Sequence, residues 1–64
     1  MSYHVTNQHL QQLKTEPDPG FLLDVVLRVN GTLHMVHEAL MWDDALLRVE
    51  DALLDGFTVE LMEA

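Results

Sequence analysis

The sequence has no cysteine among its 64 residues, and this absence limits how the chain can be stabilised. Without thiols it can form neither a disulfide nor a thiolate metal site. A chain of this length forms at most one domain and buries only about 60% of its unfolded surface. Domains this small often depend on a partner chain for further stability.

Long hydrophobic runs are absent as well. No apolar stretch approaches the roughly 18 residues of a membrane span, and residues 1–4 do not resemble a signal peptide. We therefore expect a cytoplasmic protein that makes no contact with a membrane.

Basic residues are scarce: three Lys and Arg stand against eleven Asp and Glu, for a formal net charge of −8. Phosphate binding needs clustered Lys and Arg, so we expect no direct nucleic-acid partner. A negative field favours encounter with a protein that has a basic surface. The alternative is that the acids serve only solubility. Disorder is disfavoured, because 48% of the residues are hydrophobic and their positions are patterned.

Residues 1–20 read as a polar N-terminal arm that ends in the loop sequence "TEPDPG", where two prolines and a glycine interrupt regular structure. Thr6 is a candidate cap for a short helix over residues 7–14, with Leu10 and Leu13 on one side. The arm is therefore expected to be either loose or short-helical.

From Phe21 the apolar residues alternate at period two, which indicates a strand, and Asn30-Gly31 marks a hairpin turn. We expect a three-residue bulged loop over 29–31, because it puts all apolar odd positions of both strands on one face. The residues that would share this face are Leu23, Val25, Leu27, Leu33, Met35 and Ala39.

A helix is predicted over about Trp42 to Asp55, followed by Gly56 in the left-handed position after its last turn. Its apolar stripe is narrow and has helical spacing. The stripe consists of Trp42, Ala45, Leu46, Val49, Ala52 and Leu53. A last strand should then place Phe57, Val59 and Leu61 on the core side.

These elements predict an α+β domain over residues 21–64 with the element order ββαβ. The last strand should be reached by a right-handed crossover and lie beside the first. The result is a three-stranded antiparallel sheet in the order 2-1-3, with one helix packed on one face.

Two surfaces remain as candidate binding sites. The first is on the helix, where Leu47 and Leu54 lie one heptad apart, off the core stripe, among acids. The expected partner-binding residues are Asp43, Asp44, Leu47, Glu50, Asp51, Leu54 and Asp55. The second is the outer face of the sheet, formed by Leu22, Val26, Val36, Leu40 and Met62, with His34 beside them. Such an apolar face is typically covered, by the arm, by a second copy or by a foreign protein.

The sequence predicts neither a catalytic site nor a metal site. The run "HMVHE" suggests a metal, but His34 and His37 would point to opposite faces of a strand and could not share an ion. Neighbouring carboxylates such as Asp43 and Asp44 would need a pocket that raises one pKa. We therefore expect no catalytic residue, no metal and no cofactor.

The run from Leu33 to Leu61 includes "WDDALLRVEDALLDGFTVEL". It resembles the small RNA polymerase inhibitor of T7-like phages, in which a strand is followed by a helix that contains "DEAL" and then by a strand that contains "GFEV". The matching positions here are residues 43–46 and 56–59. The resemblance covers less than half of the chain and implies a phage-encoded ββαβ host-takeover inhibitor. That inhibitor presents arginines on its last strand, where this chain has Glu60, Met62 and Glu63, so the polymerase contact is not carried over. HicB-type antitoxins have a similar strand followed by an acidic "EEAL" helix.

Two classes of function follow. The first is a non-enzymatic, phage-type inhibitor in the host cytoplasm, whose acidic surface occludes the basic nucleic-acid-binding surface of a host enzyme. DNA-mimicking anti-restriction proteins, anti-CRISPR proteins and DNA-glycosylase inhibitors work in this way. The second is a homodimeric assembly module or antitoxin-like subunit that uses the outer sheet face. Inhibition of RNA polymerase is a further alternative.

Overall fold

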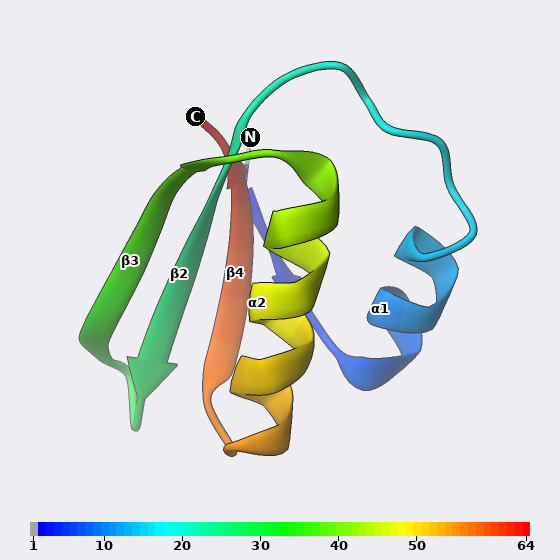
Figure 1. Cartoon of the computed structure of the whole chain (residues 1–64). Coiled ribbons are helices and arrows are strands. Elements are labelled where there is room, and N and C mark those ends of the chain that lie inside the picture. The colour runs from blue at the N-terminus through cyan, green and yellow to red at the C-terminus, as the bar shows by residue number, and fades with distance from the viewer. Residues whose placement is uncertain (1) are drawn as a thin grey trace.

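The structure, a computed structural model, describes residues 2–64, with side chains from residue 4 onward. Its elements are β1 (Ser2–Val5), α1 (Asn7–Leu13), β2 (Leu23–Val29), β3 (Thr32–Leu40), α2 (Trp42–Leu54) and β4 (Thr58–Glu63). The strands form one antiparallel sheet in the order β1-β4-β2-β3, and both helices lie on the same face of it (Figure 1). The α+β class with an antiparallel sheet is confirmed, whereas the predicted strand number of three is wrong.

The fourth strand comes from the N-terminal arm. β1 pairs antiparallel with β4, with Val5 opposite Val59, at the edge of the sheet away from β3. Of the two forms expected for the arm, the structure has the short helix. α1 packs beside α2, and Leu10 and Leu13 are buried in the same core as Val5. Residues 4–20 of the arm therefore complete the helix-covered side of the sheet, and α1 does not lie on its outer face.

The start of α1 follows from its capping residues. Thr6 Oγ1 accepts a hydrogen bond from the His9 backbone N–H at 3.2 Å, and the Thr6 N–H donates to His9 Nδ1 at 3.5 Å. This reciprocal capping box satisfies amide groups that the first turn of a helix leaves without partners. A helix of seven residues is too short to be stable alone, so its burial through Leu10 and Leu13 holds it in place.

Helix α2 agrees closely with its predicted range. Its apolar stripe faces β2 and β4, with Trp42, Ala45, Val49 and Ala52 buried and Leu46 and Leu53 partly buried. The helix ends because Gly56 adopts a φ of +88°, which glycine tolerates without strain. The N–H groups of Gly56 and Phe57 donate to the carbonyls of Leu53 and Ala52, at 3.2 and 3.0 Å. This arrangement is a Schellman motif.

The predicted three-residue hairpin loop is wrong. Val29 pairs with Thr32, and Asn30 and Gly31 both have positive φ (51° and 80°), as in a two-residue type I′ turn. The extra residue lies further along β3, because Arg28 pairs with Leu33 while Leu27 pairs with Met35. Leu33 consequently lies opposite Arg28 and not on the core face.

A further bulge lies at the other end of β3. Val25 pairs with His37 but Leu23 pairs with Leu40, so β3 has one residue more than β2 between these pairs. Ala39 has a φ of +55°, which is strained for a residue with a Cβ, and its N–H donates to Asp24 Oδ1 at 2.9 Å. The bulge turns Leu40 towards the helices, where it packs against the core. Its predicted position on the outer face is therefore wrong.

Candidate protein-binding surface

The outward side of α2 has two uncovered leucines. Leu47 is 61% exposed and Leu54 is 79% exposed, although the opposite side of the same helix packs against the core. The arm could have covered them, but α1 lies beside α2 and leaves both side chains in solvent. Because the helix is fixed by its buried stripe, these leucines have a defined position and spacing.

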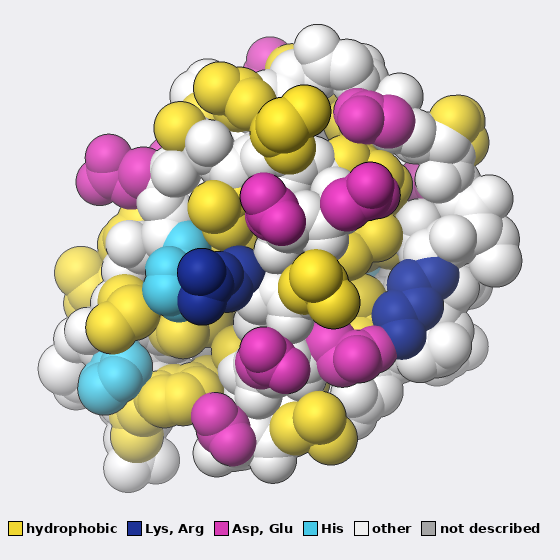
Figure 2. Space-filling model, in the orientation of Figure 1, with side chains coloured by type: hydrophobic (Ala, Val, Ile, Leu, Met, Phe, Trp, Pro, Cys, Tyr) yellow, Lys and Arg dark blue, Asp and Glu magenta, His cyan; other side chains and the backbone are white. Residues whose placement is uncertain are grey.

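Acids surround the two leucines. The exposed members are Asp43, Asp44, Asp51 and Asp55, and Glu50 is partly buried. We name this set, with Leu47 and Leu54, the acidic ridge. Figure 2 shows acidic and hydrophobic side chains interspersed over the front of the molecule, where α2 lies. The structure thus places six of the seven residues singled out from the sequence on α2 and the seventh, Asp55, at its C-cap, with the leucines exposed among the acids.

One acid of the ridge has a partner that the sequence did not indicate. Lys14, which follows α1, forms an ion pair with Glu50. The two residues are 36 positions apart, so only the packing of α1 against α2 brings them together. An open groove of about 350 Å³ lies between the helices, and Lys14, Asp43, Leu46, Leu47 and Glu50 line it. The ridge therefore borders a hollow that an inserted side chain could enter.

The outer sheet face is less open than its composition suggested. Val26 lies opposite Val36 and Glu60, on the face away from the helices, yet it is only 6% exposed. Arg28 Nε donates to Glu60 Oε1 at 2.8 Å, and this ion pair lies beside Val26 and shields it. Val36 stays exposed at the edge of the sheet.

The other members of the predicted outer patch are dispersed. Met62 pairs with Asp24 on the outer face and is partly buried, whereas Leu22 precedes β2 and is exposed. His34 was predicted on this face, but its ring stacks on Phe57 with centroids 4.8 Å apart, on the side that packs against the core. With Leu40 also turned inward, these five residues do not form one contiguous apolar surface.

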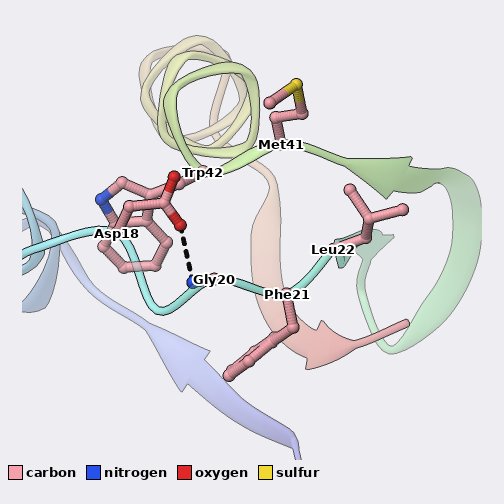
Figure 3. Close-up of a pocket in the computed structure, with 6 residues that line it drawn as sticks. All are labelled: Asp18, Gly20, Phe21, Leu22, Met41 and Trp42. Carbon is pink, nitrogen blue, oxygen red and sulfur yellow. Dashed lines mark hydrogen bonds between the residues drawn. The ribbon is translucent and has the colours of Figure 1, made fainter.

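A small hollow lies where the loop after α1 meets the start of α2. Its volume is about 190 Å³, and it is lined by Asp18, Gly20, Phe21, Leu22, Met41 and Trp42 (Figure 3). Asp18 Oδ1 accepts a hydrogen bond from the Gly20 N–H at 2.8 Å, so its carboxylate stabilises the loop. Phe21, where the period-two pattern begins in the sequence, is 43% exposed and precedes the strand, because β2 begins only at Leu23.

Within residues 4–64, no three His, Asp or Glu side chains come together where they could hold a metal ion. In residues 2–64 there is also no helix with the length and apolar character that crossing a membrane requires. The chain matches no protein-family model, and comparisons with curated proteins and with solved structures found no match.

Proposed function

We propose that this protein is a non-enzymatic inhibitor whose acidic ridge occludes a basic nucleic-acid-binding surface on a target enzyme. The observation that carries the proposal is the pair of exposed leucines, Leu47 and Leu54, held one heptad apart among carboxylates on a fixed helix. A row of charges steers the encounter with a basic surface and adds less to affinity, and scattered surface leucines are common. Apolar anchors inside a charged row supply both attraction and selectivity.

The length of the acidic ridge matches a surface that binds several phosphates. From Asp44 to Asp55 the helix rises by roughly 16 Å at about 1.5 Å per residue. One DNA strand has a phosphate about every 3.4 Å along the helix axis, so the row can cover several phosphate-binding positions. A basic groove that accepts DNA would therefore meet several carboxylates at once, and exposed Arg48 would be the one basic residue that it meets between Asp44 and Asp55.

The position of two acids argues against a role in solubility alone. Asp51 and Asp55 lie at the C-terminal end of α2, whose last turn has no basic residue. The helix dipole disfavours negative charge at this end. Solubility could be obtained from acids elsewhere at no such cost. Acids that oppose local stability are typical of residues retained for binding.

The proposal is tested by capturing partners with three forms of the tagged protein, from a lysate of the cells in which the protein acts. One is the wild type, one is Asp51→Lys/Asp55→Lys, and the control is Glu16→Lys/Glu63→Lys. Both double variants change the net charge equally, but the control residues lie off α2. The ridge variant should lose a partner that the control retains, and added duplex DNA should displace that partner from the wild type. Equal loss from both variants, or loss from neither, would contradict the proposal.

A homodimeric assembly module is the second candidate, and the edge strand β3 favours it. β3 lies at the end of the sheet and exposes Leu33, Met35 and Val36. Exposed edge strands pair readily with another chain, and a net charge of −8 per copy would make pairing stronger at high salt. Val36→Asp should then dissociate the dimer in size exclusion with light scattering. A monomer at all concentrations and salt strengths would exclude this candidate.

A further inference from the structure

A second cavity lies between the end of α1 and the ends of β2 and β4. Its volume is about 280 Å³, and its apolar lining includes Leu13, Pro19, Phe21, Trp42 and Leu61. Cavities of about 150 Å³ lined by apolar side chains can hold a benzene ring. This cavity therefore has room for a small ligand with one aromatic ring or a short alkyl chain.

Two carboxylates, Glu16 and Glu63, lie at the mouth of this cavity, and both are exposed. Glu63 continues the row of β4 residues that faces the helices, after Val59 and Leu61, which are buried. Within residues 4–64, neither Glu16 nor Glu63 forms an ion pair, and no basic residue lines the cavity. The site thus combines an apolar interior with a negative entrance.

Local hydrogen bonds fix the parts of the site. The Glu16 N–H donates to the Leu13 carbonyl at 3.1 Å, and Glu63 pairs with Leu23 in the sheet. The loop that joins α1 to β2 is held by the hydrogen bond between Asp18 and Gly20, which Figure 3 draws among the residues at this end of the molecule. A cavity that is already formed binds a ligand with little loss of conformational entropy.

We propose that this cavity binds a small organic ammonium ion, with the apolar body inside and the cationic group at Glu16 and Glu63. An aromatic ring or alkyl chain fits the lining, and an ammonium group complements the two carboxylates. Trp42 adds an indole, the aromatic side chain that attracts cations most strongly. This site is separate from the acidic ridge and does not depend on the proposed function.

Tryptophan fluorescence measures binding at this site directly, because Trp42 is the one tryptophan of the sequence and lines the cavity. Phenethylammonium is the probe, and 2-phenylethanol is the matched neutral ligand. The ammonium ion should shift and quench the Trp42 emission in a saturable titration, and the alcohol should bind about tenfold more weakly. No saturable change with the ammonium ion, or equal binding of the alcohol, overturns the proposal.

Two variants distinguish the effect of the carboxylates at the cavity from the effect of the net charge of the protein. Glu16→Gln/Glu63→Gln keeps the side-chain size and should raise the dissociation constant of the ammonium ion about tenfold. The control, Asp51→Asn/Asp55→Asn, makes the same charge change on α2 and should leave binding unchanged. Equal weakening in both variants, or no weakening in the first, overturns the proposal. Thermal melts establish that each variant is folded, and phenethylammonium should raise the melting temperature of the wild type.

Discussion

The substitution Leu10→Ala tests whether the N-terminal arm belongs to the core. Leu10 is 2% exposed and packs in the cluster formed by both helices and the sheet. Replacing a buried leucine by alanine removes apolar contacts and leaves a cavity, at a cost of about 3 kcal/mol. A domain of this size has a free energy of unfolding of roughly 3–10 kcal/mol, so the loss is a large share of it.

The assay is thermal unfolding followed by circular dichroism. At about 4–8 °C per kcal/mol for a small domain, Leu10→Ala should lower the melting temperature by roughly 12–24 °C, or unfold the protein. Leu54→Ala is the matched control, because this leucine is 79% exposed, and it should change stability by less than about 0.5 kcal/mol. If the two variants melt at similar temperatures, α1 is not docked as described.

Three further variants test local features by thermal unfolding. Thr6→Ala removes the capping hydroxyl of α1 and should cost about 1 kcal/mol, and an unchanged melting temperature would show that the capping box contributes nothing. Ala39→Gly relieves the φ of +55° and should stabilise the protein by about 0.5 kcal/mol after the added flexibility of glycine, whereas destabilisation would contradict the strain. Asp51→Lys/Asp55→Lys should raise the melting temperature by a few degrees through the helix dipole, and a lower value would remove the argument that these acids oppose stability.

The elements that sequence could predict are those set by local signals. The spacing of the α2 stripe and the glycine at position 56 define a helix and its end without reference to the rest of the chain. Asn30-Gly31 marks a turn for the same reason, since both residues tolerate a positive φ. Thr6 likewise indicated the start of α1 through its capping hydroxyl.

The features that sequence missed depend on tertiary contacts. Residues 2–5 have no strand pattern of their own, and they form β1 because β4 offers a free edge. The two bulges of β3 each shift the pairing by one residue, and the second turns Leu40 from the outer face to the core. A hydrogen bond from Ala39 to Asp24 accompanies this bulge. Because the two residues are 15 positions apart, no local sequence pattern predicts it.

The candidate sites also combine features that local sequence patterns predict with features that depend on tertiary contacts. The positions of Leu47 and Leu54 followed from helical periodicity, and both are exposed in the structure. The ion pair between Lys14 and Glu50 did not follow, because it requires α1 to pack beside α2. The cavity bordered by Glu16 and Glu63 also needs three separate segments of the chain to meet.

The central claim, that the acidic ridge binds a basic surface, is tested most directly by the salt dependence of binding to the captured partner. The dissociation constant is measured for the wild type and for Asp51→Asn/Asp55→Asn, which removes two charges of the ridge without reversing them, between low and physiological salt. For the wild type we predict at least about a tenfold loss of affinity as salt rises, with a much smaller change for the variant. An affinity of the wild type that stays constant over this range would contradict the claim.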